Sequence, residues 1–189
     1  MSDAESIVKV LNQPGSVIVM ASDTVYGLIA RAEDKTAVAR LYSLKERHSK
    51  PGTLIGLNIG QLSRFGLKKR YLKAVSQYWP GPMSVIVPSG NPDLNYLTQG
   101  LSDLAVRIPD NRLLARIMAS CGPLITTSAN LPGQPTAVTI NEAKAYFQDS
   151  VDAYFDGGDL SGRQPSTIIR VVDDAIEVIR EGAVKIAGE

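Results

Sequence analysis

The sequence predicts an α/β domain built around one mixed parallel and antiparallel sheet. Short apolar runs typical of buried strands alternate with helical patterns, in which apolar residues recur at every third or fourth position. Two late strand-like runs joined by Asp173-Asp174 indicate a hairpin, which makes the sheet mixed. The 189 residues contain no repeat and no linker-like stretch, so we expect a single domain over residues 1–189.

The first half of the chain combines helix caps with buried apolar runs. Ser2 and Glu5 have the spacing of a capping box, and Asp34 stands where it can cap a later helix. The polar residues 22–27 predict a loop, and Trp79-Pro80-Gly81-Pro82 must end a helix because proline cannot continue it. The expected elements are a helix before Pro14, strands at 17–20 and 28–30, a helix at 35–44, a strand at 54–57 and a helix at 68–78.

The second half follows the same logic and ends in strands. Asn111 is placed to cap one helix, and Thr139 with Glu142 forms a second capping box. Residues 91–102 predict a loop, and Pro109 stops the strand before it. The expected elements are strands at 83–87 and 104–107, a helix at 112–120, a strand at 124–127, a helix from 139 to 147, and strands at 151–155, 167–171 and 176–180.

The composition excludes several classes of protein. Hydrophobic residues make up 44% of the chain, which excludes wholesale disorder, and a net charge of +1 gives no strong general attraction to nucleic acid or membranes. The single cysteine and single histidine, Cys121 and His48, predict no internal disulfide, no metal bound by protein ligands and no histidine-based triad. The start lacks a signal peptide, and no apolar run reaches the roughly 20 residues of a membrane span, so we expect a cytoplasmic protein without membrane contact.

Neither standard phosphate-binding fingerprint is present, so a phosphate would be held by side chains and loop amides. The densest basic run is Lys68-Lys69-Arg70, which we interpret as a solvated helix start.

Two short polar clusters stand where regular elements are expected to end. Lys45 and Arg47 follow the helix at 35–44, where two cations fit either a grip on phosphate or a solvated helix end. Ser128 and Asn130 follow the strand at 124–127, where their side chains could read a ligand or bond their own backbone in a turn. The pattern alone leaves both alternatives open for each cluster.

Two further segments carry polar groups at strand ends. Thr24, Tyr26 and Gly27 offer a hydroxyl, a phenol and close backbone approach, although a plain tight turn explains them equally well. Arg107 ends a strand before Ile108-Pro109 and suits either a ligand carboxylate or an ordinary ion pair.

Taken together and in order, these motifs resemble the YrdC-like threonylcarbamoyl-AMP synthase family, in the short single-domain bacterial form known as TsaC. The matching stretches cover nearly the whole chain, and only their joint occurrence is specific. They are Ser22-Asp23-Thr24-Val25-Tyr26-Gly27-Leu28, Lys45-x-Arg47, Trp79-Pro80-Gly81-Pro82, Ala105-Val106-Arg107-Ile108-Pro109, Thr127-Ser128-Ala129-Asn130, Pro165-Ser166-Thr167-Ile168 and Arg180-Glu181-Gly182.

The resemblance implies a YrdC-like fold, in which a twisted mixed sheet with flanking helices has a concave ligand-binding face. It also implies an enzyme, a nucleotidyltransferase that joins L-threonine, bicarbonate and ATP, with Mg²⁺, into threonylcarbamoyl-AMP and releases pyrophosphate. The implied partners are the proteins of a tRNA threonylcarbamoyl-transfer complex, with tRNA itself as a further candidate.

Residue roles are carried over position by position. The family's functional tetrad falls on Lys45, Arg47, Ser128 and Asn130. The residues expected to face ATP are Arg47, Lys50, Asn130 and Arg180. The residues expected around threonine are Thr24, Tyr26, Arg107, Ser128 and Ser166.

The chain departs from the family pattern at a few positions. Ala21-Ser22-Asp23 replaces Pro-Thr-Glu, His48 stands in place of a proline, and Ser84 and Pro132 replace a threonine and a serine. The short tail after Arg180 predicts that the extra C-terminal domain of longer members is missing. Two other functions remain as alternatives: a non-catalytic tRNA- or RNA-binding module, and a paralogue that adenylates a different carbamate.

Overall fold

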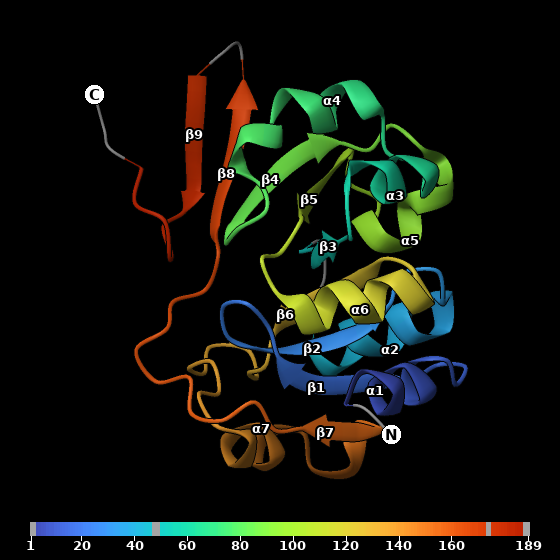
Figure 1. The fold of residues 1–189 in the computed structure, drawn as a ribbon, viewed down its shortest axis with the longest axis vertical. Helices are drawn as coiled ribbons and strands as arrows, with labels where there is room; N and C mark the ends of the chain where they lie inside the picture. Colours follow the sequence, from blue (N-terminus) through green and yellow to red (C-terminus); the bar gives the residue numbers. More distant parts are fainter. Residues whose placement is uncertain (1–2, 47–49, 173–174, 187–189) are drawn as a thin grey trace.

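The structure is a computed structural model that describes residues 3–46, 50–172 and 175–186. Within these ranges nine strands form one sheet in the order β7-β1-β2-β6-β3-β5-β4-β8-β9 (Figure 1). The strands are β1 (Val17–Ala21), β2 (Tyr26–Arg31), β3 (Thr53–Ile55), β4 (Met83–Pro88), β5 (Asp103–Arg107), β6 (Leu124–Ser128), β7 (Ala153–Phe155), β8 (Thr167–Val172) and β9 (Ala175–Arg180). The α-helices are α1 (Asp3–Leu11), α2 (Lys35–Leu44), α3 (Ile59–Arg64), α4 (Lys69–Ala74), α5 (Asn95–Thr98), α6 (Arg112–Cys121) and α7 (Ile140–Phe147).

The sheet is mixed, as the sequence predicts. β1 pairs with β7, β3 with β5 and β4 with β8 in parallel, whereas the other neighbours are antiparallel. β8 and β9 form the expected hairpin and end the sheet at one edge (Figure 1). The predicted turn at Asp173-Asp174 lies outside the described residues, as does Ser2 of the first capping box.

The two faces of the sheet are covered differently. Because side chains alternate along a strand, Val17 and Val19 of β1 join one hydrophobic cluster with α2 and α7, whereas Ile18 and Met20 join a second cluster with α1 and α6. The first cluster extends across the sheet to β4, β5 and β8, beneath α3, α4 and α5. The second reaches β3 through Ile55 and includes no residue of β4, β5 or β8. The α1–α6 layer therefore leaves part of its face of the sheet uncovered.

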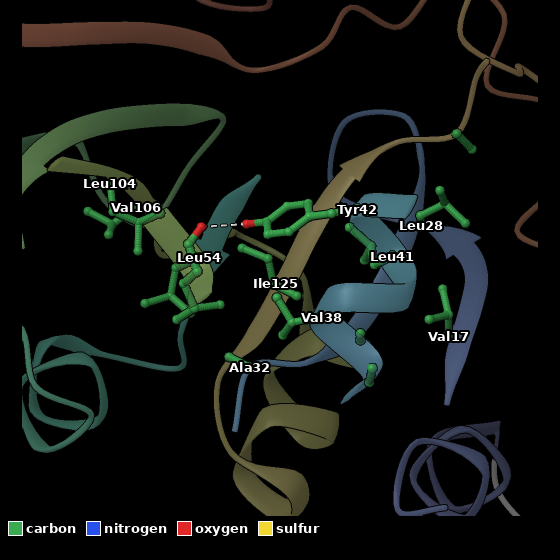
Figure 2. Close-up of a cluster of buried hydrophobic side chains, with 14 of the residues drawn as sticks. Val17, Leu28, Ala32, Val38, Leu41, Tyr42, Leu54, Leu104, Val106 and Ile125 are labelled. Carbon is green, nitrogen blue, oxygen red and sulfur yellow. Dashed lines mark hydrogen bonds between the residues drawn. The ribbon is translucent and has the colours of Figure 1, made fainter. Parts of the chain in front are cut away.

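Helix α2 illustrates how the local sequence positions the site. Asp34 caps the helix as predicted, with its carboxylate accepting hydrogen bonds from the N–H groups of Ala37 at 2.9 Å and Gly15 at 2.7 Å. Val38 and Leu41 are fully buried against the sheet (Figure 2). Each such side chain contributes about 1.5–3 kcal/mol to folding. The helix ends at Leu44, where the sequence predicts its end.

Tyr42 ties the end of α2 to the neighbouring segments. Its ring lies in the first cluster (Figure 2), and its hydroxyl donates to the carbonyl of Leu97 at 2.6 Å. The same oxygen accepts from the N–H of Gly52 at 3.2 Å. These bonds hold the segment before β3 beside the C-terminus of α2.

The predicted loop at residues 22–27 is wrong at its end, because β2 begins at Tyr26. Gly27 pairs with Met20 of β1 and with Ser128 of β6, so strand pairing on both sides overrides the low strand propensity of glycine. A Cβ atom at this glycine would lie 2.8 Å from Thr126 Oγ1, so only glycine fits here without displacing that side chain.

Two other expectations need correction, and one helix was not expected. The predicted loop at 91–102 contains a 3₁₀ turn, Pro92–Leu94, followed by α5, because buried Leu94 and Leu97 fix it to the core. The predicted helix at 68–78 is shorter: α4 ends at Ala74, and a 3₁₀ turn occupies Ser76–Tyr78 before the prolines. Helix α3, which has six residues and is capped by the side chain of Asn58, is not among the predicted elements.

Candidate functional site

A small polar cavity lies on the part of the sheet face that the α1–α6 layer leaves uncovered. Its volume is about 120 Å³, and its walls come from β2, β3, β5, β6, β8 and β9 with the adjoining loops. Among the described residues that line it, two are charged, Arg107 and Arg180. Hydroxyl side chains supply most of the remaining polar lining: Ser22, Thr24, Thr53, Thr126, Thr127, Ser128 and Ser166. Such a lining suits a small polar molecule that carries negative charge.

Arg107 lies at the buried end of β5 and forms an ion pair with Asp23. Its Nη2 is 3.1 Å from Asp23 Oδ1, and the two side chains are only 4% and 5% exposed. The contact is a close charge pair without hydrogen-bond alignment, since both Asp23 oxygens and Arg107 Nε are buried without a hydrogen-bond partner among the described residues. A buried guanidinium with an unused N–H is suited to take a further carboxylate oxygen.

Burial acts on both members of this pair. It raises the pKa of the Asp23 carboxyl above 3.8, although the charge of Arg107 lowers it again in part. It also lowers the pKa of Arg107, which the Asp23 charge raises in part. Arginine remains charged at neutral pH even so. Burying the two charges costs free energy, so removal of either partner would leave the other charge buried and unpaired.

Lys45, Ser128 and Asn130 form one hydrogen-bond network between the end of α2 and the end of β6. The buried ammonium of Lys45 donates to Asn130 Oδ1 at 2.7 Å, to the carbonyl of Ser128 at 2.9 Å and to the carbonyl of Asn130. Ser128 Oγ also donates to Asn130 Oδ1, at 2.7 Å. Tertiary structure thus joins two clusters that are 83 residues apart in the chain.

The amide nitrogen of Asn130 completes this network. It donates to the carbonyls of Leu131 at 3.1 Å and Gln134 at 2.8 Å. The turn is therefore present, shaped by Asn130, and Ser128 also lines the cavity. Asn130 and Lys45 stand behind the cavity wall and do not line it.

Ser166 and Arg180 meet at the opposite side of the cavity. Arg180 donates to the carbonyl of Ser166 through Nε at 3.2 Å and Nη2 at 2.6 Å, and Nη2 is also 3.2 Å from Ser166 Oγ. Ser166 Oγ lies 3.0 Å from Ser84 Oγ on β4. The hydroxyl of Ser166 is therefore held by two neighbours beside the cavity.

Thr24 and Tyr26 contribute from the β1–β2 connection. Both are buried and line the cavity, and Thr24 Oγ1 is 3.1 Å from Ser22 Oγ. The Tyr26 hydroxyl, however, contacts the loop after β7: it is 2.8 Å from the Gly158 carbonyl and accepts from the N–H of Gly157 at 2.9 Å. It also lies 3.0 Å from Asp156 Oδ1. Burial raises the pKa of Tyr26, so this hydroxyl stays protonated at neutral pH.

The predicted site residues thus divide into four groups. Six line the cavity: Thr24, Tyr26, Arg107, Ser128, Ser166 and Arg180. Lys45 and Asn130 stand directly behind it. Lys50 is exposed, with its N–H bonded to Gln99 Oε1 at 2.9 Å, and is not part of the lining. Arg47 lies outside the described residues.

Sequence reasoning missed several residues that shape the site. Asp23 has no role in the predicted site, yet it is the ion-pair partner of Arg107. Ser84 has no predicted role either, and it contacts Ser166. Asp156 precedes a Gly-Gly pair, a loop signal that carries no hint of its contact with Tyr26.

The side chains of the described residues decide how a metal ion could be held at the site. In the part of the chain that the structure describes, no three histidine, cysteine, aspartate or glutamate side chains gather as a metal site. Mg²⁺ in nucleotide-using proteins is commonly held by the substrate's phosphates together with one or two carboxylates. A Mg²⁺ ion bound mainly through the nucleotide fits the residues present. No helix in the described part is long and apolar enough to cross a membrane.

The fold is an open mixed sheet that carries a small polar cavity, lined in part by two arginines, on one face. The family model for Sua5, YciO and YrdC proteins, which carries the description "Telomere recombination", matches residues 10–182. The chain belongs to this family. A threonylcarbamoyl-AMP synthase from Stutzerimonas stutzeri is 34% identical over 169 residues, which is 88% of this chain and 90% of that protein.

Solved structures show the same fold. P. abyssi Sua5 in complex with L-threonine has a TM-score of 0.83 at 24% identity, over 95% of this chain and 54% of that one. E. coli YciO has a TM-score of 0.82 at 26% identity, over 96% of this chain and 90% of that one. The family assignment confirms the resemblance drawn from the motifs and the fold expected from it.

Proposed function

We propose that this protein is an L-threonylcarbamoyladenylate synthase, with the cavity as its threonine site. The observation that carries the proposal is a hydroxyl-lined cavity that holds the buried guanidinium of Arg107. The relatives named as threonylcarbamoyl-AMP synthases, and the related structure that binds L-threonine, support the same function.

The cavity supplies groups that match each polar part of threonine. Arg107 would take the carboxylate, since its Nε has no hydrogen-bond partner among the described residues. Thr24, Ser128 and Ser166 would bond the hydroxyl and amino groups from the cavity wall. Positioning of this kind is the main contribution that such a site makes to a reaction between two bound substrates.

In the proposed reaction the threonine amine attacks the carbon of bicarbonate, and water leaves as the carbamate forms. A carbamate oxygen then attacks the α-phosphorus of ATP, and the bond to the β-phosphate oxygen breaks to release pyrophosphate. Negative charge builds up on phosphate oxygens, so catalysis needs fixed cations more than a protein nucleophile. Mg²⁺ bound to the nucleotide would neutralise part of this charge.

The protein's own cations are assigned by position. Arg180 borders the cavity beside Ser166, and we place it with Arg47 and Lys50 on the nucleotide. Lys45 would support catalysis by holding the turn that carries Ser128 and Asn130. Its buried positive charge would also make the electrostatic potential at the cavity wall more favourable for an anion. Asn130 would face the nucleotide from the same turn.

The product would pass to a complex that transfers the threonylcarbamoyl group to tRNA. The proposed partners are therefore the proteins of that complex, and the use of ATP and tRNA would place the protein in the cytoplasm.

The test is a pyrophosphate-release assay with purified protein, ATP, Mg²⁺, bicarbonate and threonine. Threonine-dependent release together with a threonylcarbamoyl-adenylate peak in mass spectrometry is the expected result. Ser128→Ala should abolish most of it, whereas Ser43→Ala, on the exposed side of α2, should retain it. Pyrophosphate release that does not depend on an amino acid would contradict the proposal.

A paralogue with another substrate is the second candidate, because the fold of YciO matches as closely as that of Sua5. The same assay with serine, valine and no amino acid separates the two. A synthase for threonine should prefer threonine over valine by at least about tenfold in kcat/KM, since a valine leaves hydrogen-bonding hydroxyls of the cavity unmatched.

A further inference from the structure

The carboxylate of Asp23 is buried without a hydrogen bond. Its side chain is 5% exposed, and neither oxygen has a hydrogen-bond partner in the part of the chain that the structure describes. Buried carboxylates normally accept hydrogen bonds, because a charged oxygen without them costs free energy in the interior. The packing of the fold does not explain such a group, so we ask what it does for the site.

The turn that carries Asp23 explains why its oxygens lack donors. An aspartate in a turn commonly accepts a hydrogen bond from the N–H two residues later, which here belongs to Val25. Ser22 Oγ takes that N–H instead, at 3.2 Å, together with the N–H of Thr24 at 3.1 Å. Ser22 Oγ also donates to the carbonyl of Val25 at 2.7 Å. The turn therefore fixes the backbone at Asp23 and directs its side chain to Arg107.

Charged groups reach Asp23 from several parts of the chain. Burial has the largest effect on the pKa of Asp23 and raises it, while the charge of Arg107 has the next largest and lowers it. Asp110, beyond the end of β5, adds a smaller rise, and Arg163, in the segment before β8, adds a smaller fall. The net result is a raised pKa, so Asp23 takes up a proton more readily than an exposed aspartate does.

Arg107 faces both Asp23 and the cavity. Its Nη2 is 3.1 Å from Asp23 Oδ1, and its side chain lines the cavity, whereas Asp23 stands behind it and is not among the described lining residues. A ligand carboxylate in the cavity would therefore share one guanidinium with Asp23. One positive charge would then face two negative charges in a buried place, where charges interact more strongly than in water.

Two carboxylates that share a site do not both stay charged without cost, because each raises the pKa of the other. Three properties favour protonation of Asp23 over that of the ligand. The pKa of Asp23 is already raised, and no hydrogen bond from the described residues stabilises its charge. The hydroxyls of Ser128 and Ser166 line the cavity and are available to a ligand. An α-carboxyl group is also the stronger acid, with an ordinary pKa of about 3.5 against about 3.9 for aspartate.

We propose that Asp23 is the resident counter-ion of Arg107 and yields to the carboxylate of the substrate by taking up one proton from solvent. That the substrate is threonine rests on the proposed function. In the empty site Asp23 keeps the buried guanidinium paired. When threonine binds, its carboxylate pairs with Arg107 and a solvent proton binds to an Asp23 oxygen, so the charges around Arg107 still sum to zero. Asp23 is thus a positioning residue that competes with the substrate and does not touch it.

The proposal predicts how affinity depends on pH. Because binding takes up a proton, the affinity for threonine should rise as the pH falls, by up to about tenfold per pH unit. Asp23→Asn imitates the protonated carboxyl and leaves Arg107 without a counter-ion in the empty site. This variant should therefore bind threonine about tenfold more tightly at pH 7, the factor that corresponds to one pKa unit, and its affinity should depend less on pH.

The experiment is isothermal titration calorimetry with threonine between about pH 5.5 and pH 7, where the carboxyl and amino groups of free threonine keep their charges. Each titration is run in two buffers that differ in heat of ionisation, and the difference gives the number of protons taken up. The wild-type protein should take up as much as about one proton more per threonine than Asp23→Asn. Asp93→Asn is the matched control and should behave as wild type, since Asp93 is exposed and forms no ion pair with any residue that the structure describes.

Thermal melts of the same samples check the fold of the variant. Asp23→Asn should melt below wild type without threonine, and threonine should raise its melting temperature more than that of wild type, because the substrate restores the counter-ion of Arg107. If the variant does not fold, the proton count of the wild-type protein still decides, since binding without proton uptake contradicts the proposal.

Two further outcomes overturn the proposal while threonine still binds, so that the proposed function stands. They are equal proton uptake by wild type and Asp23→Asn, and weaker binding of threonine by a folded Asp23→Asn variant. If neither protein binds threonine, the proposed function fails together with this inference.

Discussion

The ammonium of Lys45 lies 2.7 Å from the side-chain oxygen of Asn130, and this contact fastens the C-terminus of α2 to the turn after β6. The same ammonium holds the carbonyls of Ser128 and Asn130. Lys45 therefore acts in the site as a buried support of the Ser128–Asn130 turn.

Lys45→Met should destabilise the Ser128–Asn130 turn and lower the rate of pyrophosphate release. It leaves buried oxygens of Ser128 and Asn130 unpaired, at a cost of about 1–3 kcal/mol in unfolding free energy. Pyrophosphate release should fall at least about 100-fold, since the variant loses both the fixed positive charge behind the cavity wall and the support of the Ser128–Asn130 turn. Urea unfolding measures the loss of stability, and the release assay measures the loss of activity. A variant with wild-type turnover would show that the reaction does not need Lys45.

The Asp23–Arg107 pair should show strong coupling in a double-mutant cycle. Asp23→Asn or Arg107→Met alone leaves one buried charge unpaired, which destabilises a protein by about 3–5 kcal/mol. The double variant should lose clearly less than the sum, as measured by urea unfolding. Additivity within about 0.5 kcal/mol would mean that the two charges do not interact.

Tyr26→Phe should loosen the loop after β7. The change removes the hydroxyl contacts with Asp156, Gly157 and Gly158, and we expect a loss of about 1–3 kcal/mol. Limited proteolysis should cut segment 156–164, which is exposed except at Leu160, faster, and the KM for threonine should rise. Tyr146→Phe is the matched control, because its hydroxyl bonds the carbonyl of Pro135 in an exposed position. Equal effects in both variants would argue against a specific role for Tyr26.

Gly182→Ala should disturb the Ser166 side of the cavity. A Cβ atom at Gly182 would lie 2.1 Å from the carbonyl oxygen of Pro165 and 2.7 Å from the carbonyl carbon of Ser166, and backbone cannot move aside cheaply. The variant should raise the KM for threonine at least about fivefold, corresponding to about 1 kcal/mol. Ala183→Ser, at the exposed next residue, should leave the KM unchanged. An unchanged KM in Gly182→Ala would show that this wall of the cavity takes no part in threonine binding.

The cap of α2 predicts a dependence of stability on pH. Burial alone would raise the pKa of Asp34, but the N–H groups of Ala37, Gly15 and Thr36 outweigh it and hold the pKa below 3.8. A carboxyl with a lowered pKa in the folded state stabilises the protein above its unfolded pKa of about 3.9, and this stabilisation is lost as the pH falls through the folded pKa.

Thermal melts between pH 6 and pH 2.5 test this. Asp34→Asn should keep most of the cap while losing part of the acid dependence, and Asp34→Ala should lose about 0.5–2 kcal/mol at neutral pH. A wild-type protein and an Asp34→Asn variant with identical pH profiles would show that the Asp34 charge contributes nothing.

Local patterns predicted the elements whose ends carry caps or buried apolar runs. The helix at 35–44 matches α2 at both ends, and the caps at Asn111 and Thr139 are confirmed, because a side chain next to its own helix needs no distant partner. The same local reasoning places Gly27 in a loop, which is wrong. Its pairing with two neighbouring strands sets its conformation. The short helices α3 and α5 carry too few residues for a helical period to show.

The sequence by itself determined the class of fold, the family and the residue types of the site, because these depend on local periodicity and on motifs in a fixed order. Only the tertiary structure decided which groups meet. It pairs Arg107 with Asp23, 84 positions away, sets Lys45 behind Asn130, and turns the Tyr26 hydroxyl toward Asp156. Such contacts depend on strand order and on burial, which no single segment of the chain encodes. The two polar clusters at the ends of α2 and β6 thus become one network only when the sheet forms.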